Sequence, residues 1–224
     1  MSKRCAVNFA DSGWYLLGQA RLRQSLIDHG FSGGVLLFQS ADQLGCPPHS
    51  EVPYAFKAAA INRAVSAGYT TVLWCDASVW AVNPLDVLFE QIEQEGHVFF
   101  LNVGHNCAQW TSDACLAQMQ FSRDEAEKIP QLDAKCMGFN LANARSAEFL
   151  RCFSEHAKDG SFKGSASNES GQASADPRCR GHRWDQAVAS LLAHRLQMSL
   201  TERFYDWTPN AKEPVVLTCG SIRL

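Results

Sequence analysis

The sequence predicts an α/β fold: a single domain with a central, mostly parallel sheet flanked by helices on both faces. Two observations favour this class. Short apolar runs alternate along the chain with longer segments of helical periodicity, which is the pattern of repeated strand and helix units. The run TTVLWC, residues 70–75, also lacks polar alternation, as expected for a strand covered on both faces in a parallel sheet.

The first half of the chain predicts a strand, helix, strand, helix, strand order. The three apolar strands are residues 4–11, 33–40 and 70–75. The two helices between them, residues 14–30 and 54–69, each end close to a glycine, which is a good signal for a helix C-terminus. The second of these helices is rich in alanine.

The second half continues the alternation with weaker signals. The predicted helices are residues 83–96, 146–158 and 182–196, and the predicted strands are residues 97–104, 136–142 and 215–218. Between residues 106 and 133 the patterning indicates two short helices. Residues 161–181 are mostly small and polar, so we expect almost nothing in them to be buried and predict a mobile loop within the domain.

Composition sets limits on function and location. The 224 residues suit one domain covering residues 1–224, and the net charge of −3 without a basic block argues against charge-driven binding of nucleic acid. The nine cysteines include no C-x-x-C pair, which argues against a disulfide framework or a zinc ribbon. No signal-like or membrane-spanning apolar run is visible, so we expect a cytoplasmic protein without stable membrane insertion.

The stretch TVLWCDASVW, residues 71–80, ends an apolar strand on Asp76, with Ser78 two residues later. In open parallel sheets, ligands bind at the carboxyl ends of strands. Residues two apart in an extended chain point the same way, so this carboxylate and hydroxyl would hold one hard cation, Mg²⁺ or Mn²⁺, or the diphosphate bound to it. The alternative is that Asp76 only caps the following turn.

A second polar stretch is GHRWDQ, residues 181–186, at a predicted helix start after the polar loop. Its donors, among them Arg183, would face a phosphate, and Asp185 would face a sugar hydroxyl or a leaving group. The alternative is an ordinary helix start in which Asp185 interacts with the helix dipole while His182 and Arg183 are solvated.

Two further stretches contain residues suited to a nucleotide. In YAFK, Tyr54 would stack on a base and Lys57 would neutralise a phosphate, unless the aromatic side chains belong to the core. In MGFNLAN, Gly138 would let a ligand approach the backbone and Asn140 would offer an amide, although a plain strand with a packing glycine is the favoured interpretation.

Together, YAFK, LWCDAS, NPLDVLF, GFNLAN and GHRWDQ resemble the nucleotide-sugar-dependent glycosyltransferases of the GT-A fold, over about residues 4–205. That family usually has a D-x-D motif, which binds a divalent cation bridging the diphosphate of the donor. Here the motif is Asp76-Ala77-Ser78. Because serine is a neutral and weaker ligand, this D-x-S variant weakens the expectation of tight metal dependence.

The resemblance implies roles for individual residues. The metal, Mn²⁺ or Mg²⁺, would be held by Asp76, Ser78 and His182. Asp185 and Gln186 would act at the donor sugar and the reacting centre. Phe9, Ala10 and Asp11 would meet the nucleobase, with Tyr15 close by, and Asn140 would meet the donor sugar or the acceptor. With the stretches described above, the expected donor-binding residues are Phe9, Ala10, Asp11, Tyr15, Tyr54, Lys57, Asp76, Asn140 and Arg183.

The expected reaction is transfer of a sugar from a nucleotide sugar, UDP-linked, to an acceptor hydroxyl, with the cation, Lys57 or Arg183 stabilising the departing phosphate. An inverting enzyme would use Asp185 as its base, with Asp113 and Asp133 as other candidates, whereas no base is evident for a retaining one. The loop 161–181 would close over the donor, unless it is a surface insertion without a function.

Other functions are weighed against transfer. A binding domain of the same fold without catalysis is the main alternative. A nucleotidyltransferase is a more distant one, because no glycine-rich basic phosphate loop follows the first strand. A glycan, a protein, a small molecule and a hydroxymethylated nucleic-acid base all remain candidate acceptors. The last of these would need a basic face built from Arg21, Arg23, Arg178, Arg180 and Arg183.

Overall fold

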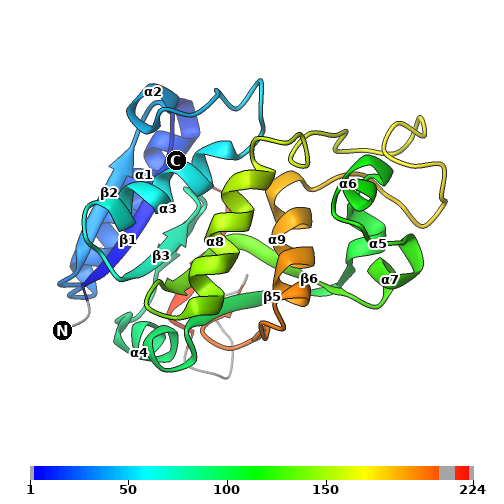
Figure 1. Ribbon diagram of the computed structural model, residues 1–224. Coiled ribbons are helices and arrows are strands. Elements are labelled where there is room, and N and C mark those ends of the chain that lie inside the picture. The colour runs from blue at the N-terminus through cyan, green and yellow to red at the C-terminus, as the bar shows by residue number, and fades with distance from the viewer. Residues whose placement is uncertain (1–2, 207–214, 222–224) are drawn as a thin grey trace.

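The computed structural model describes residues 3–206 and 215–221, and its central sheet contains five strands in the order β2-β1-β3-β6-β5 (Figure 1). They are β1 (Arg4–Phe9), β2 (Gly34–Phe38), β3 (Thr71–Cys75), β5 (His97–Asn106) and β6 (Pro130–Asn140). β1 pairs in parallel with β2 and β3, while β6 runs antiparallel to both β3 and β5. Only β6 is reversed in this sheet, and the predicted fold class with its mostly parallel sheet is confirmed.

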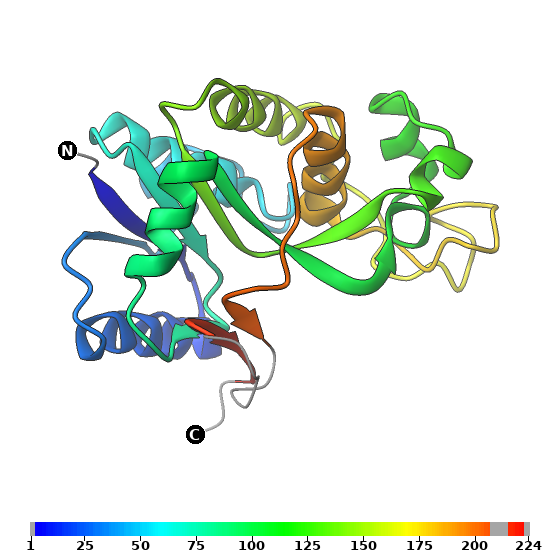
Figure 2. The same ribbon diagram turned by 90° about the horizontal axis from the view of Figure 1, so that it is seen from below.

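Helices cover both faces of the sheet (Figures 1 and 2). One face packs against α3 (Ala55–Ser66), α8 (Ala144–His156) and α9 (Trp184–Arg195). The other face packs against α1 (Gly13–Asp28), α4 (Asp86–Glu95) and a small second sheet of β4 (Val79–Ala81), β8 (Leu217–Cys219) and β7 (Tyr205–Asp206). The predicted strand at residues 215–218 corresponds to β8. The sequence analysis contained no counterpart of β4, β7 or the short helix α2 (Ala41–Leu44).

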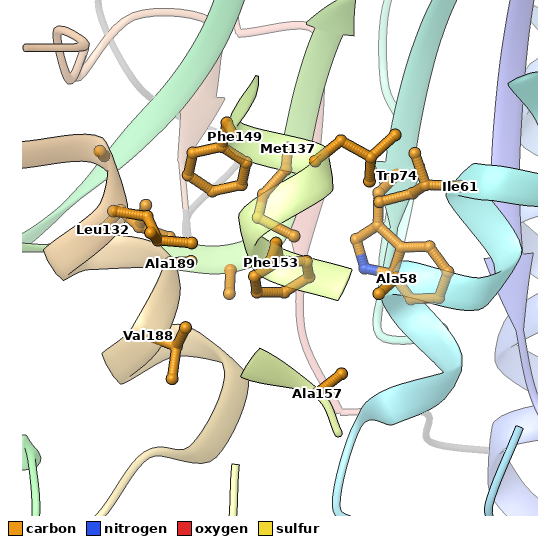
Figure 3. Packing of buried hydrophobic residues seen from close by; sticks show 14 of the residues in the cluster. Ala58, Ile61, Trp74, Leu132, Met137, Phe149, Phe153, Ala157, Val188 and Ala189 are labelled. Carbon is orange, nitrogen blue, oxygen red and sulfur yellow. The ribbon is translucent and has the colours of Figure 1, made fainter. Parts of the chain in front are cut away.

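The alanines of α3 explain how this helix packs so closely on the sheet. Ala58, Ala60 and Ala64 are all buried, and every residue of β3 beneath them is buried too. Small side chains on the inner face leave room for the indole of Trp74 between helix and sheet. Figure 3 shows this core with α3, α8 and α9 side chains around β3 and β6; labelled are Ala58, Ile61, Trp74, Leu132, Met137, Phe149, Phe153, Ala157, Val188 and Ala189.

Strand β6 departs from the prediction in length and in direction. It begins at Pro130, six positions before the predicted start, because polar residues interrupt the apolar pattern of its first half. Its pairing with β5 is irregular: Phe99 lies opposite Met137, but the next residue, Phe100, lies opposite Asp133. A bulge of this kind changes which backbone groups face a neighbouring strand, and it often occurs next to a functional site.

Three short helices, not the predicted two, lie between β5 and β6: α5 (Cys107–Trp110), α6 (Asp113–Gln118) and α7 (Arg123–Glu127). Side chains at their N-caps explain where each begins. Asn106 and Ser122 form capping boxes with Gln109 and Glu125, and the Ser112 hydroxyl accepts from the N–H of Cys115. These helices form a compact arm at the far end of the β5–β6 ribbon (Figure 1).

Residues 161–181 contain no helix or strand, as predicted, but the expectation that almost nothing in them is buried is wrong. Phe162, Ala173 and Cys179 are buried among the arm and the core. The amide of Asn168 holds the loop together, because its Nδ2 donates to the carbonyls of Ser174 and Cys179 while its Oδ1 accepts from the N–H groups of Ala173 and Ser174. The loop is therefore anchored by specific polar contacts.

Replacing Asn168 by alanine is expected to lower the free energy of unfolding by about 2 kcal/mol, because several buried backbone groups lose their partner at once. Limited proteolysis should then cut residues 161–181 faster than in the unmodified protein. Ser170→Ala, an exposed position in the same loop, serves as the control. Equal cleavage rates for N168A and S170A would contradict the anchoring role of this amide.

All nine cysteines lie within the described residues and are free thiols. Within residues 3–206 and 215–221, none of the helices combines the length and the apolar character needed to span a bilayer. The cytoplasmic location stays a prediction.

Candidate functional site

The carboxyl ends of β1 and β3 open into two adjoining hollows. The first, of about 340 Å³, follows the end of β1 and is here called the Phe9 hollow; its lining includes Phe9, Ala10, Asp11, Ser12, Tyr15, His49, Tyr54, Phe56, Asp76, Ala77 and Ser78. The second, of about 360 Å³, is called the Asp185 hollow; its lining includes Tyr54, Lys57, Asp76, Asn102, His105, Trp110, Gln131, Ala134, Lys135, Arg183, Trp184, Asp185 and Gln186. Asp76 and Tyr54 line both hollows and so mark the seam between them.

Three charged residues from separate parts of the chain meet at this seam. Lys57 Nζ, on α3, lies 3.0 Å from Asp76 Oδ1 after β3 and 2.8 Å from Asp185 Oδ2 in the first turn of α9. It also donates to the carbonyl of Ala134 at 2.9 Å, a group that the β6 bulge places there. The contact between Lys57 and Asp185 is an ion pair. Lys57 is only 2% exposed.

The electrostatics of this Lys57–Asp76–Asp185 triad follow from burial and charge. Burial alone would lower the pKa of Lys57, but the carboxylates of Asp185 and Asp76 outweigh it, and the net pKa is raised. Burial raises the pKa of Asp185 from 3.8 to about 6, and although Lys57 opposes this shift, Asp76 adds to it. At neutral pH Lys57 is therefore protonated and Asp185 is mostly ionised, so the two form a buried ion pair.

If the sugar transfer expected from the sequence depends on ionised Asp185, its rate should rise with pH and level off above about pH 6. Below that value turnover should fall about tenfold per pH unit as the carboxyl takes up a proton and its ion pair with Lys57 is lost. The folded-state pKa is raised, so the same group favours folding below about pH 4 and loses this contribution as the pH rises through 6. A pH profile of the turnover rate checks the assignment. D185N is expected to lack the fall in rate below pH 6. If D185N shows the same fall, another group causes it.

Asp76 is held in place on several sides. Its Oδ1 accepts from the indole N–H of Trp74 at 2.8 Å, and its own N–H donates to the carbonyl of Lys135 at 2.8 Å. Two residues later, the carbonyl of Ser78 accepts from Arg21 Nη2 and from the N–H of Gly220, both at 3.1 Å. The D-x-S segment is therefore a rigid turn fixed by α1 and the C-terminal segment.

The Phe9 hollow is lined by aromatic side chains. Phe9 and Phe56 stack with ring centroids 4.2 Å apart, and the ring of His49 meets that of Tyr54 edge-on at 4.8 Å. Tyr15, on the first turn of α1, is 61% exposed at its rim. The structure thus brings together four residues expected at or beside the nucleobase, namely Phe9, Ala10, Asp11 and Tyr15.

Two aromatic residues that line the Asp185 hollow have strained backbones. Tyr54, before α3, has φ 61°, and Trp184, the first residue of α9, has φ 40°, both unusual for residues with a side chain. Their rings lie 5.4 Å apart, and the Trp184 indole N–H donates to the carbonyl of Gly164. Strain of this type costs of order 1–3 kcal/mol per residue and is concentrated at functional sites.

Comparison with known proteins defines the fold further. The sequence matches no protein-family model and no curated protein. Among solved structures, the chain is similar to mouse xyloside xylosyltransferase 1 in its apo form, with a TM-score of 0.51 and 9% identity over 98% of each chain. This chain therefore shares the overall fold of that xylosyltransferase. At such low identity the likeness concerns the fold alone.

Two other solved structures are similar at lower scores. The bifunctional glycosyltransferase WbbM has a TM-score of 0.49 and 12% identity, over 94% of this chain and 41% of WbbM. A glycosyltransferase involved in glycosylation of the major capsid of PBCV-1 has a TM-score of 0.45 and 10% identity, over 70% of this chain and 67% of the other.

His182 is not placed where a metal ligand is needed. The residue is fully buried, its Nδ1 accepts from the N–H of Ser112, and its Nε2 lies 3.0 Å from the carbonyl of Ser161. Burial lowers its pKa to about 4, so the ring is neutral at neutral pH. Both ring nitrogens are used in packing the loop against α6, and the structure does not support the predicted metal role of His182.

Asn140 is also far from the seam, because β6 is antiparallel to β3. It pairs with Thr71 at the start of β3, whereas Cys136 pairs with Cys75 at the end. At ~3.3 Å per residue, Asn140 lies roughly 13 Å along the strand from the site. Its side chain binds the carbonyl of Glu93 and the N–H of Ala142. The prediction that Asn140 meets the donor sugar or acceptor is therefore wrong, while Gly138 packs closely on Ile92 as the favoured interpretation required.

The two other candidate bases lie outside both hollows. Asp113 is bound by Arg123 and by the hydroxyl of Ser174 in the arm. Asp133 is buried, pairs with Lys135 and accepts from the hydroxyl of Tyr205. Of the carboxylates considered as a base, only Asp185 lines the cleft.

The candidate basic face is not assembled either. Arg21 stacks over Trp80 at 3.8 Å, and Arg178 pairs with Asp176, Asp124 and Glu127. Arg183 alone of the five arginines lines the cleft.

Several cleft residues were missed by sequence reasoning. Asn102, His105, Trp110, Gln131 and Lys135 come from β5, α5 and the first half of β6, where the patterning is weak. The N-x-x-Q capping signal of α5 was the one local feature that could have placed Trp110 at the end of a short helix.

Proposed function

We propose that this protein is a glycosyltransferase that moves a sugar from a nucleotide sugar, UDP-linked, to an acceptor hydroxyl. The observation that carries the proposal is the Lys57–Asp76–Asp185 triad at the seam of the two hollows. A buried carboxylate, Asp185, and a partly exposed one, Asp76, lie between an aromatic hollow and a polar one. This arrangement is suited to a ligand with a flat base at one end and hydroxyls at the other.

The ligand would lie across the seam. The base would occupy the aromatic Phe9 hollow, the diphosphate would lie at Asp76 and Ser78, and the sugar would extend into the Asp185 hollow. In the reaction the bond between the anomeric carbon and the phosphate oxygen breaks, and the nucleoside diphosphate leaves with the bonding electrons. The acceptor oxygen bonds to the anomeric carbon and gives up its proton.

Within this reaction, the residues of the triad have different roles. Asp185 would accept hydrogen bonds from donor hydroxyls or take the acceptor proton, and the amide of Gln186 lies beside it in the same hollow. Lys57 would keep both carboxylates ionised and oriented. Because its charge is already offset by two carboxylates, it adds little net charge to stabilise the leaving diphosphate.

The residues at the seam fit a hard divalent cation only in part. The Asp76 carboxylate and the Ser78 hydroxyl are oxygen ligands of the kind that Mg²⁺ and Mn²⁺ prefer, and Mg²⁺ is commonly held by one or two carboxylates together with substrate phosphates. Within the described ranges, no cluster of three His, Cys, Asp or Glu side chains could hold a metal by itself. A cation would therefore bind with the donor, where it would offset charge on the leaving diphosphate.

A thermal-shift series tests the proposal. UDP-, GDP- and ADP-linked sugars, each with and without Mn²⁺, are compared, because a ligand that binds the native state raises its unfolding temperature. We expect stabilisation by the UDP-linked sugars, larger with Mn²⁺, and slow release of UDP from the best donor. Stabilisation without any release or transfer would favour the catalytically silent binding domain, which the Ser78 departure also suggests. No shift with any nucleotide sugar would contradict both.

A further inference from the structure

The Asp185 hollow has a second wall, formed by the β5–β6 ribbon and by the residue before α9. It is here called the donor-rich wall and consists of Asn102, His105, Gln131 and Arg183, with Trp110 behind them. These residues offer hydrogen-bond donors, whereas the carboxylates that line the same hollow are Asp76 and Asp185 of the triad.

Arg183 contributes an uncompensated positive charge to this wall. Its guanidinium stacks 4.2 Å over the ring of Trp110, and its backbone N–H donates to the Trp110 carbonyl at 3.0 Å. Across the described parts of the chain, the guanidinium forms neither an ion pair nor a hydrogen bond. By contrast, Lys57 is paired with two carboxylates and Lys135 with Asp133. The stacked guanidinium is therefore pre-oriented with its donors unused.

Gln131 provides an independent sign of a missing ligand group. The residue is 1% exposed and lines the hollow, and its Oε1 accepts from Asn102 Nδ2 at 3.1 Å. Its Nε2 has no partner among the described residues. A buried donor without a partner is unfavourable, and such groups are rare unless a ligand or water completes them.

His105 adds a third donor. Its Nδ1 accepts from the indole N–H of Trp110 at 3.0 Å, so the neutral ring carries its proton on Nε2.

The position of the wall separates it from the diphosphate. Lys135 lies beside the seam, because its carbonyl accepts a hydrogen bond from the N–H of Asp76. Gln131 lies four residues further along β6, up to about 13 Å away at ~3.3 Å per residue. A group bound at Gln131 therefore lies farther from the diphosphate than the donor sugar, on the side from which an acceptor would approach.

We propose that the donor-rich wall is the acceptor subsite and that the acceptor is a glycoside carrying an oxyanion, either the carboxylate of a uronic acid or the phosphate of a sugar phosphate. This rests on the proposed function. Arg183 binds the oxyanion with its planar fork, and Gln131 Nε2 donates to the same group or to a neighbouring hydroxyl. The stacked arginine determines specificity by favouring charged over neutral acceptors.

Calorimetric titrations at fixed ionic strength test this, on protein saturated with UDP and Mn²⁺. The probes are methyl glucuronide, glucose 6-phosphate and methyl glucoside. We expect at least one of the two anions to bind about tenfold or more tightly than the neutral glycoside, and the stronger of the two identifies the oxyanion. In Arg183→Gln, whose planar amide still stacks on Trp110, the preference should fall below about threefold. Gln131→Met should weaken binding of every probe.

Arg63→Gln, an exposed arginine on α3, is the matched control and should leave the preference unchanged. The proposal is overturned if no probe shows a preference, if the preference survives in Arg183→Gln, or if the anions are displaced by UDP and so occupy the donor site. UDP binding and donor hydrolysis are measured on the same preparation. If both are present without an anion preference, only the acceptor assignment fails, whereas their absence refutes the proposed function itself.

Discussion

Replacing Lys57 by methionine is expected to lower the free energy of unfolding by about 3–5 kcal/mol, because it leaves Asp185 and Asp76 facing one another without a cation. Asp185 is buried, so water cannot solvate its carboxylate in place of the lost ammonium group. The carbonyl of Ala134 loses its donor as well. Urea denaturation at pH 7 measures the loss.

A double variant separates the loss of charge balance from the loss of packing. Lys57→Met combined with Asp185→Leu removes the buried charge together with its counter-ion, and it should recover at least half of the lost stability. Asp76 keeps its hydrogen bond from Trp74 and is 24% exposed, so it tolerates the change. Turnover of the donor should be absent in the double variant, because it lacks Asp185. A K57M protein within about 1 kcal/mol of the unmodified one would show that the triad is not a buried charge cluster.

Asp185→Asn is expected to reduce turnover about 10²- to 10⁴-fold while leaving UDP affinity within about threefold. The reason is positional, since Asp185 lines only the hollow assigned to the sugar, and not the Phe9 hollow assigned to the base. The amide is nearly isosteric, and Lys57 keeps its contact with Asp76. Initial rates of UDP release and calorimetric affinities provide the two readouts.

Asp113→Asn is the matched control for that experiment. Asp113 was a candidate base from the sequence, but it lies in the arm and binds Arg123. Asp113→Asn should keep the normal turnover rate if Asp185 is the carboxylate that acts in the reaction. A similar loss in both variants would mean that the effect is structural and that the assignment of Asp185 is incorrect.

The three residues of the triad could be predicted as site residues from the sequence because each belongs to a local pattern. Asp76 follows a fully apolar strand, Lys57 lies at the head of an alanine-rich helix, and Asp185 lies in a polar helix start. Local patterns of this kind predict elements and their ends, and in parallel strands the ends meet at one edge. The pairing of these three residues around one ammonium follows from the tertiary packing, and no sequence pattern contains it.

The misplacement of Asn140 and the omission of several cleft residues both result from the direction and length of β6. Its apolar second half predicted a strand but gave no indication of direction, and the reversal moved Asn140 to the opposite edge of the sheet. The same reversal brought Ala134, Lys135 and Gln131 to the cleft, from a segment whose polar residues conceal a strand. His182 was misread for a different reason, because a histidine that packs a loop and one that binds a metal look identical in sequence.

We propose above that Asp76, at the seam of the two hollows, binds the diphosphate of a nucleotide sugar through a divalent cation. The most direct test is calorimetric titration of UDP with Mn²⁺ into the unmodified protein, into Asp76→Asn, and into Asp86→Asn, which changes an exposed aspartate that pairs with Arg4. We expect saturable binding that Asp76→Asn weakens at least about tenfold and Asp86→Asn leaves unchanged. Absence of UDP binding to the unmodified protein, or equal affinity in Asp76→Asn, would contradict it.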